Sequence, residues 1–292
     1  MATALFSTIA VSSYADEKDS FKNVFNEYEY YQAINNASKE ELEQIGLDKQ
    51  DVNAFSSTFE DNLYERAIMS DSELCGLGYT EQEIALLRKY AQGSELSDAE
   101  MRAISGTCTT YFKLSYASRR IASFYYEWTW DHCPLSPLND SVAIEWTAYG
   151  YDGDTVDLIV ERKSSSIAYY WETEPKDDFR YSVPGELETN LSFDGLCLKV
   201  PVLGESDIGS GVPAVFYAKT GYVGVDLKVD ESVSRDIYFI QASGLYGHTQ
   251  VGIGFPSVSL TNGKLSFGGN LSVNEIGRRK VEIYNDGTIK YV

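Results

Sequence analysis

The spacing of apolar and polar residues changes along the chain near Thr107. Before this point apolar residues recur at steps of three and four, which is typical of one buried helix face. After it they alternate with polar residues, as in a strand that buries one face. The pattern predicts an α+β protein, with a helical region over residues 16–106 and a β domain over residues 107–292.

Several helix features can be read directly from the helical region. One helix is predicted to begin near Lys18, with an apolar face formed by Phe21, Val24, Phe25, Tyr28, Tyr31 and Ile34. A hydroxyl residue followed three positions later by Glu has the capping-box spacing, in which each side chain binds the other residue's backbone N–H. This spacing predicts helix starts at Ser38 with Glu41, Thr80 with Glu83 and Ser97 with Glu100.

Residues 41–52 and 73–84 echo each other within this region. In each, a glycine (Gly46 or Gly78) stands where a helix ends through a left-handed residue, and an Asp or Thr two positions later begins the next helix. We therefore predict two helix-turn-helix hairpins. We expect these hairpins to pack on each other or on the β domain. Alternatively, the helical region serves as a pro-region or as a regulatory cap.

In outline these hairpins resemble helix-hairpin-helix DNA-binding units. Such units bind phosphate with backbone N–H groups and basic residues. Residues 1–106 carry 20 acidic against 8 basic residues, which opposes that function.

Alternation in the β domain is clearest over residues 124–130, where Phe124, Tyr126 and Trp128 share one face. Further apolar sets are Val142, Ile144 and Trp146; Val156, Leu158 and Val160; Val223, Val225, Leu227 and Val229; and Val251, Ile253 and Phe255. Tight turns with positive φ are predicted at Asp152-Gly153, Asn262-Gly263 and Asp286-Gly287. About ten to twelve short strands at this spacing predict an antiparallel β-sandwich, with a barrel as the alternative.

The charge of the chain narrows the set of partners. The sequence has 44 acidic and 24 basic residues, a net charge of −20. Such a polyanion repels phosphate backbones and anionic lipid surfaces, so nucleic acid is not an expected partner. We expect an extracellular protein or a glycan as partner, and a membrane only if the protein forms pores.

The N-terminus has features of a secretory signal peptide over residues 1–15. An apolar, uncharged stretch over residues 2–11 is followed by Ser13 and Ala15, the small residues that signal peptidase reads, and then by Asp16. No basic residue precedes the apolar stretch, so the predicted signal peptide is a truncated one; a buried strand or helix is the alternative. We expect a secreted, extracellular protein.

The four cysteines are candidates for two disulfide bonds: Cys75, Cys108, Cys133 and Cys197. No Cys-x-x-Cys pair occurs, which opposes a zinc site. Isolated buried thiols are the alternative interpretation.

One set of residues in the β domain carries a resemblance to known proteins. It consists of Tyr126–Trp130, Pro134, Pro137, Asp140, Val142–Trp146 and Tyr246–His248. This set is similar to uncharacterised exported proteins of Gram-positive bacteria, in which two Trp-bearing strands flank a proline turn and a Tyr-Gly-His segment follows. That group has no known activity, so the resemblance implies export alone.

The sequence contains few residues with catalytic spacing. The two histidines are His132 and His248. Neighbours on an extended chain point in opposite directions, so His132 cannot pair with Cys133. A nucleophilic site would need His248 with Cys133 or Cys197, whereas a half-buried, hydrogen-bonded imidazole is the common alternative. No nucleophile elbow, P-loop or His-Glu-x-x-His motif occurs.

Two surface chemistries stay open. Asp152, Asp154 and Asp157 can offer oxygen ligands to Ca²⁺, although turn geometry also explains them; no other cofactor is expected. The surplus of aromatic residues suggests flat platforms for sugar rings, with cross-strand packing as the alternative. The candidate ligand-binding residues are Tyr125, Tyr149, Tyr169, Tyr170, Trp171 and His248.

Three classes of function follow from these observations. The first is a secreted binding or interaction protein that recognises a cell-surface protein or glycan. The second is a pore-forming or membrane-active protein whose strands over residues 221–230 and 257–273 rearrange. The third is an extracellular hydrolase with site residues far apart in the sequence. We favour the first, because the sequence lacks a catalytic signature.

Overall fold

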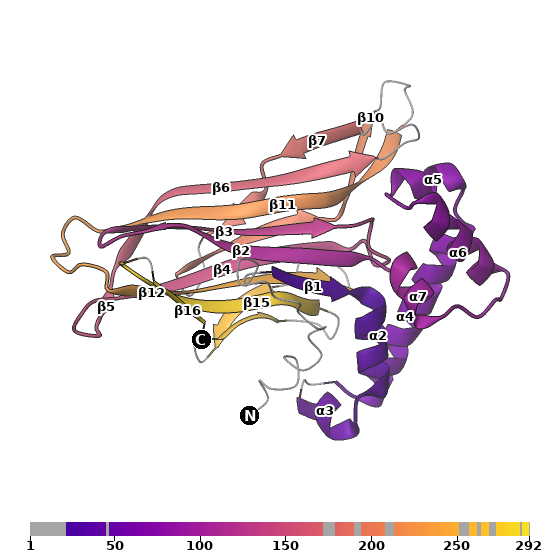
Figure 1. Ribbon diagram of the computed structural model, residues 1–292, viewed down its shortest axis with the longest axis horizontal. Helices are drawn as coiled ribbons and strands as arrows, with labels where there is room; N and C mark the ends of the chain where they lie inside the picture. The colour runs from indigo at the N-terminus through magenta and orange to yellow at the C-terminus, as the bar shows by residue number, and fades with distance from the viewer. Residues whose placement is uncertain are drawn as a thin grey trace.

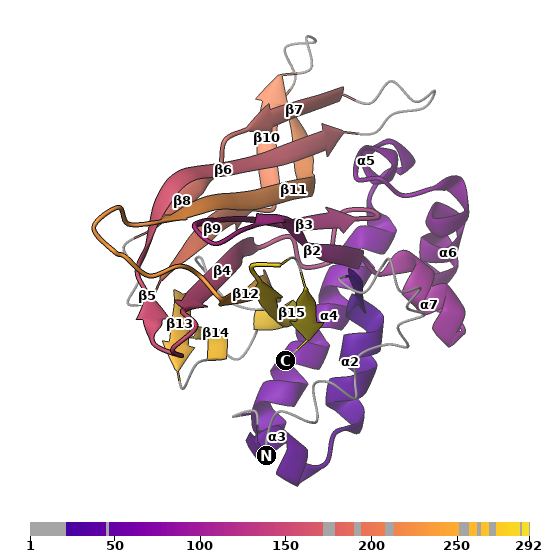
Figure 2. The same ribbon diagram turned by 60° about the vertical axis from the view of Figure 1, so that its left-hand side comes forward.

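The computed structural model describes residues 22–44, 47–171, 179–189, 194–207, 213–250, 257–261, 264–268, 273–286 and 288–291. In this part of the chain the strands form two large antiparallel sheets in a sandwich-like arrangement, not a closed barrel. The helices lie together at one end of the sheets (Figure 1, Figure 2). The described residues contain no helix that is both long and apolar enough to span a membrane.

The helices follow one another without an intervening strand. Their bounds are α2 (Glu27–Asn36), α3 (Lys39–Gln44), α4 (Lys49–Ile68), α5 (Asp71–Gly76), α6 (Glu81–Ala91) and α7 (Asp98–Ile104).

The first sheet has the strand order β1-β2-β3-β11-β6-β7, with β10 paired to β11. Its strands are β1 (Lys22–Asn26), β2 (Thr107–Ala117), β3 (Ile121–Trp130), β6 (Leu158–Trp171), β7 (Phe179–Val183), β10 (Leu203–Asp207) and β11 (Pro213–Val229). All its described pairings are antiparallel.

The second sheet has the order β16-β15-β12-β4-β9-β8, with β5 paired to β4, and β13 and β14 form a separate hairpin. The strands are β4 (Asn139–Tyr149), β5 (Thr155–Val156), β8 (Glu186–Glu188), β9 (Gly195–Pro201), β12 (Phe239–Thr249), β13 (Ser257–Thr261), β14 (Lys264–Gly268), β15 (Val273–Tyr284) and β16 (Ile289–Tyr291).

The main hydrophobic core contains side chains from both sheets. Phe124, Tyr126 and Trp128 of β3 are all 0% exposed and belong to one cluster with Ile144 of β4 and Val225 of β11. This confirms the predicted alternation on β3. A second cluster lies within the helices and includes Cys133 and Tyr217 from the β region.

Two sequence predictions about strands need correction. Val24 and Phe25 belong to β1, which pairs with β2, and the first described helix begins only at Glu27. Phe21 lies outside the described residues. Val160 is 42% exposed, although Val156 is buried, because β5 ends before Asp157 and the pairing of β6 with β11 shifts register. A purely local pattern cannot foresee either irregularity.

The predicted helix starts are confirmed at Ser38, Thr80 and Ser97, where both hydrogen bonds of each capping box form. Gly78 has φ of +89°, as predicted for a left-handed residue after a helix. Gly46 lies outside the described residues.

The predicted turns are seen in part. Gly153 has φ of +82°. β13 pairs with β14 and β15 with β16, as hairpins at these two places require, but Asn262, Gly263 and Gly287 themselves lie outside the described residues. The strand predicted over residues 251–255 lies outside the described residues, as does the predicted signal peptide.

The prediction of two disulfide bonds is wrong: none of the four cysteines forms one. They lie on separate elements: Cys75 is in α5 and Cys108 in β2, whereas Cys133 follows β3 and Cys197 is in β9. Cys108 belongs to the core between the sheets and Cys133 to the helical cluster, so these two thiols face different surroundings. Burial raises the pKa of the Cys133 thiol to about 11.

Replacing Gly78 by alanine is expected to lower the free energy of unfolding by about 2 kcal/mol, of which about 1 kcal/mol comes from its left-handed backbone. The added Cβ would also collide with the Tyr217 hydroxyl and lie 3.2 Å from the Cα of His132. Gly93 is the matched control, because its φ is +78° and its Cβ would meet nothing within 4 Å. Urea unfolding measures both variants, and equal losses would contradict the steric argument.

Candidate functional site

The outward side of the first sheet presents aromatic and polar side chains in rows across three strands. We call this surface the outer face and define it by β3, β11 and β6. Its register places the following residues side by side: Ser123 with Asp226 and Arg162, Tyr125 with Gly224 and Ser164, Glu127 with Tyr222 and Ser166, and Thr129 with Thr220 and Ala168. The alternate residues of β3 and β11 point into the core, which fixes the direction of these side chains.

Tyr125 lies across its neighbouring strand because Gly224 has no side chain. A Cβ at Gly224 would overlap the Cδ1 and Cε1 atoms of the Tyr125 ring. The ring of Tyr222 meets that of Tyr125 at a centroid distance of 6.3 Å and an interplanar angle of 62°. Gly224 is buried while Tyr125 stays partly exposed, so the ring forms a platform on the sheet.

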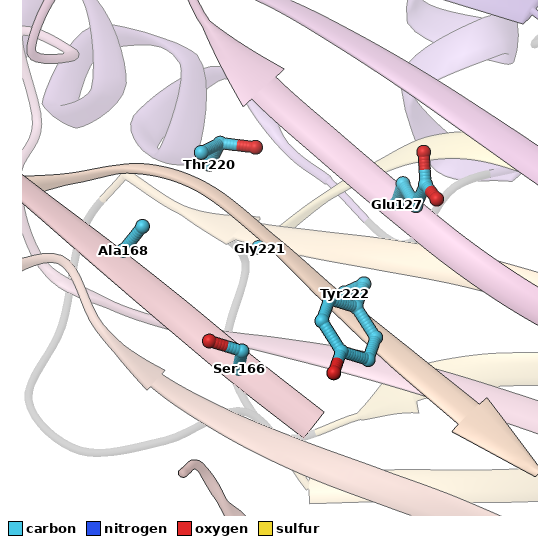
Figure 3. A pocket seen from close by; sticks show the side chains of 6 residues that line it. All are labelled: Glu127, Ser166, Ala168, Thr220, Gly221 and Tyr222. Carbon is cyan, nitrogen blue, oxygen red and sulfur yellow. The ribbon is translucent and has the colours of Figure 1, made fainter. Parts of the chain in front are cut away.

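A shallow hollow of about 240 Å³ lies beside this platform. Glu127 borders it from β3, Thr220, Gly221 and Tyr222 from β11, and Ser166 and Ala168 from β6 (Figure 3). The hollow is smaller than the roughly 300–1,000 Å³ of pockets that enclose drug-sized ligands. It therefore suits one part of a ligand that spreads over the sheet.

Most polar groups of the outer face are held by neighbours on the sheet. The Thr129 and Thr220 hydroxyls lie 3.2 Å apart, and Thr220 donates to the Trp128 carbonyl at 2.9 Å. Glu127 forms an ion pair with Lys113 of β2. A ligand on this face would meet a preformed surface rather than one that must be ordered on binding.

Asp226 and Arg162 form the charged end of the same face. Ser123 Oγ donates to Asp226 at 2.6 Å, and Arg162 Nε donates to it at 2.7 Å. The Ser123 hydrogen bond, followed by the Arg162 contacts, holds the pKa of Asp226 below its ordinary value. The Asp226 hydrogen bond and charge raise the pKa of Arg162.

The structure does not bring the other predicted aromatic residues to this face. Tyr149 stacks on Phe239 at 4.8 Å in the second sheet. Tyr170 packs against the helical cluster and Trp171 against the main core. Tyr169, another candidate for ligand binding, is not on the surface: it is 4% exposed, and its hydroxyl donates to the Pro201 carbonyl.

Two of the three predicted calcium ligands, Asp152 and Asp154, are paired with an arginine in the described structure. Arg235 Nε lies 3.2 Å from a carboxylate oxygen of Asp152, and its Nη2 lies 2.9 Å from Asp154. Within the described residues, no group of three or more His, Cys, Asp or Glu side chains is placed to hold a metal. Calcium binding by Asp152, Asp154 and Asp157 stays a prediction, and the ion would have to displace Arg235.

His248, a predicted ligand-binding residue, is 0% exposed and lies at the centre of a buried network. Its Nδ1 is 3.1 Å from Asp140 Oδ2 on β4, and its Nε2 is 3.3 Å from Glu27 Oε1 at the start of α2. Glu27 and Asp140 are also 0% exposed. We call these three residues the buried triad. Their burial removes His248 from contact with a surface ligand.

Further hydrogen bonds satisfy both carboxylates of the buried triad. Asp140 accepts the Tyr246 hydroxyl and the Thr249 N–H, each at 2.7 Å. Glu27 accepts the N–H groups of Gly106 and Leu135 at 2.8 and 2.9 Å. The triad thereby ties the start of the helices to the second sheet.

The electrostatics of the buried triad favour a charged imidazolium. Burial by itself lowers the pKa of His248, but the charge of Asp140 and the hydrogen bonds of Asp140 and Glu27 raise it to about 9. The contacts of His248 and the backbone N–H groups outweigh the burial of Glu27 and keep its pKa below the ordinary value. The arrangement is an ion network in which the His248 imidazolium lies between two carboxylates, not a nucleophilic site.

The second histidine also lacks a catalytic arrangement. His132 stacks on Tyr79 at a centroid distance of 4.1 Å, and its Nδ1 lies 3.1 Å from the Cys133 carbonyl oxygen. The Cys133 Sγ lies 3.9 Å from Arg66 Nη2, which donates to the Pro134 carbonyl at 2.8 Å. The thiol therefore has a guanidinium rather than an imidazole beside it.

Sequence reasoning found Tyr125 but missed the residues that complete the outer face. Gly224, Tyr222 and Thr220 looked like the polar phase of an ordinary strand. A glycine opposite an exposed tyrosine is a recognisable signal once strands are paired. The pairing of β3 with β11, however, joins residues about a hundred positions apart, which a local pattern does not show.

Comparisons with known proteins leave the family open. No family model matches the chain, and no curated protein matches it. Among solved structures, it is similar to the collagen-binding subdomain of the Enterococcus faecalis surface protein ACE, with 9% identity, a TM-score of 0.27, and coverage of 60% of this chain and 96% of that one. A second is AvmM, which catalyses macrocyclization in alchivemycin A biosynthesis, with 13% identity, a TM-score of 0.23, and coverage of 49% and 74%. Likenesses at these TM-scores carry no argument about fold or function.

Proposed function

We propose that this chain is an exported binding protein whose outer face recognises a neutral glycan. The observation that carries the proposal is the Tyr125 ring, which lies over Gly224 next to Tyr222. A flat ring offers apolar contact to the C–H face of a sugar, and nearby hydroxyls offer hydrogen bonds to sugar hydroxyls.

The composition of the outer face supports a carbohydrate over an apolar ligand. Hydroxyls from Ser164, Ser166, Thr129 and Thr220 surround the rings on adjacent strands. A net charge of −20 disfavours phosphorylated or carboxylated glycans, which leaves neutral and amino sugars.

The same proposal covers the organisation of the chain. The mature protein begins near Asp16, and the helical region over 16–106 and the β-sandwich over 107–292 act as one unit. The buried triad supports this, because Glu27 binds His248 across the two regions. The resemblance to exported proteins of Gram-positive bacteria supports an extracellular location.

The two other classes of function have no specific observation in their favour. Residues 221–229 of β11 lie in the middle of the first sheet, paired to β3 and to β6, so pore formation would require both pairings to break. A hydrolase would need converging reactive groups, whereas His248 binds two buried carboxylates rather than Cys133 or Cys197.

Replacing Tyr125 by alanine is expected to weaken glycan binding about tenfold, equivalent to ~1.4 kcal/mol, because the variant loses the ring platform. The first measurement is an array of neutral, amino and acidic glycans, followed by calorimetric titration of the best hit. Tyr151→Ala is the control, because Tyr151 is 64% exposed and follows β4 in the other sheet.

The result that contradicts the proposal is an unchanged affinity of Tyr125→Ala for a glycan that the unaltered protein binds. Absence of binding to every neutral and amino glycan on the array would equally rule it out. Thermal unfolding of both variants checks that each is folded before binding is compared.

A further inference from the structure

A second concave surface lies among the helices, away from the outer face. It is a groove of about 700 Å³ bordered by α2, α4, α6, α7 and the segment that joins α6 to α7, and we call it the helical groove. The helices that form it stand together at the end of the sheets (Figure 2). The outer face and the helical groove share no lining residue.

Aromatic rings form much of the groove wall. Tyr31 of α2 stacks on Phe59 of α4 with ring centroids 4.4 Å apart and an interplanar angle of 25°. Tyr28 stacks on Tyr31 at 6.1 Å. Tyr64 is 52% exposed at the surface of α4, and Tyr90 lines the groove from α6. The faces of aromatic rings carry negative electrostatic potential, which attracts cations.

The charged groups of the groove have one sign. Glu60 and Glu95 line it, and no Lys, Arg or His does. The basic residues Lys89 and Arg102 of the adjoining helices form ion pairs with Glu100 and Glu29 at 3.0 and 2.8 Å. These two positive charges are therefore neutralised by acidic residues that do not line the groove.

Glu60 is joined to the rings directly. The Tyr31 hydroxyl donates to Glu60 Oε1 at 2.8 Å. Burial and this hydrogen bond raise the pKa of Tyr31 to about 12, so its hydroxyl stays protonated and continues to donate. Tyr90 lines the same groove as Glu60, and burial, followed by the charge of Glu60, raises the pKa of the Tyr90 hydroxyl. The groove therefore combines an exposed carboxylate with two neutral phenol rings.

We propose that the helical groove binds a small organic cation of the alkylammonium class, with its methyl groups against the rings of Tyr31, Tyr64 and Tyr90 and its charge near Glu60. A quaternary ammonium suits this site better than an inorganic ion. It is weakly hydrated and needs no hydrogen-bond acceptors, and aromatic faces of this kind bind it through cation–π contacts. The proposal is independent of glycan binding by the outer face.

The test compares two probes of the same shape on the full chain. Choline and its neutral isostere 3,3-dimethyl-1-butanol are titrated separately in a calorimeter, with the Tyr ring signals followed by NMR. Choline is expected to bind at least tenfold more tightly than the isostere. Equal affinities, or no binding of choline at millimolar concentration, would overturn the proposal.

Variants locate the binding. Glu60→Gln keeps an acceptor for the Tyr31 hydroxyl but removes the charge, and Tyr64→Leu removes an exposed ring; each is expected to weaken choline binding about tenfold. Glu65→Gln is the control, because Glu65 is exposed on α4 but does not line the groove. An affinity unchanged by Glu60→Gln, or a loss of the same size in Glu65→Gln, would refute the site. Urea unfolding of each variant verifies its fold.

Discussion

Replacing His248 by alanine is expected to lower the free energy of unfolding by about 3–5 kcal/mol, the cost of removing one partner from a buried ion network. Two carboxylates depend on this residue. Asp140 and Glu27 are both 0% exposed, and His248 lies within 3.3 Å of each. Without the imidazolium, two like charges would stay buried, held only by hydrogen bonds and, for Glu27, by the charge of the buried Arg66 nearby.

The loss is measured by urea unfolding monitored through the four tryptophans. The fluorescence of Trp130 reports directly on the surroundings of His248, because the two ring centroids are 4.9 Å apart. If His248→Ala does not accumulate as a folded protein, His248→Gln and Glu27→Gln provide milder tests of the same network. The matched control for Glu27→Gln is Glu65→Gln on the exposed side of α4, for which no change beyond about 0.5 kcal/mol is expected.

A loss of less than about 1 kcal/mol for His248→Ala would show that water or a local rearrangement compensates the carboxylates. Hydrogen exchange at the backbone amides that bind Glu27 gives a second measure of the loss. The N–H groups of Gly106 and Leu135 donate to its carboxylate, so amide hydrogen exchange at these two residues should accelerate in the His248 variants.

The buried triad also shows where sequence reasoning stops. Local patterns predicted the alternation of β3 and the capping boxes at Thr80 and Ser97, because those features depend on residues at most six positions apart. Glu27, in contrast, looks in the sequence like an ordinary acidic residue within the helix predicted to begin near Lys18. Its partner His248 lies 221 positions away along the chain.

The β4 strand illustrates a second limit. Its apolar residues Val142 and Ile144 were placed correctly in the core. The intervening positions were expected to face water, yet Ser141, Ala143 and Glu145 are buried as well. β4 lies between β12 and β9 within the second sheet, and the burial of these three residues shows that its second face is covered as well. Polarity alone does not reveal that a face is covered by another part of the chain.

The outer face was predicted only through Tyr125, for a related reason. Its chemistry depends on the rows that run across β3, β11 and β6. The register of the strand pairing decides which residues share a row. In the pairing of β11 with β6 this register shifts between Ala218 and Thr220, so the rows cannot be found by counting residues along the strands. The absence of a side chain at Gly224 acquires meaning only when Tyr125 is placed opposite it.

The stability of the protein is expected to fall by on the order of 3 kcal/mol as the pH rises from about 6.5 to about 9, through the titration of His248. The folded state raises the pKa of His248 to about 9, above the ordinary value of 6.5. The folded state therefore binds the proton more tightly than the unfolded chain. The stabilisation is complete below pH 6.5 and is lost progressively as the pH approaches 9.

Glu27 has the opposite dependence. Its pKa is lower in the folded protein than the ordinary value of 4.5, so its contribution is present above that pH and is lost as the pH falls below it. The triad should thus stabilise the fold most between about pH 4.5 and 6.5. The neighbouring Cys108 and Tyr246 do not titrate in this window, because burial raises the pKa of both groups well above their ordinary values.

The measurement is the free energy of unfolding in urea at closely spaced pH values from 4 to 9.5, for the unaltered protein and for His248→Gln. The net charge of −20 makes overall repulsion grow with pH in both proteins, so the difference between the two curves isolates the histidine. That difference should narrow steadily above pH 6.5. Parallel curves over this range would mean that His248 stays neutral in the folded state, and that the two buried carboxylates are held by their other hydrogen bonds and by the charge of Arg66 near Glu27.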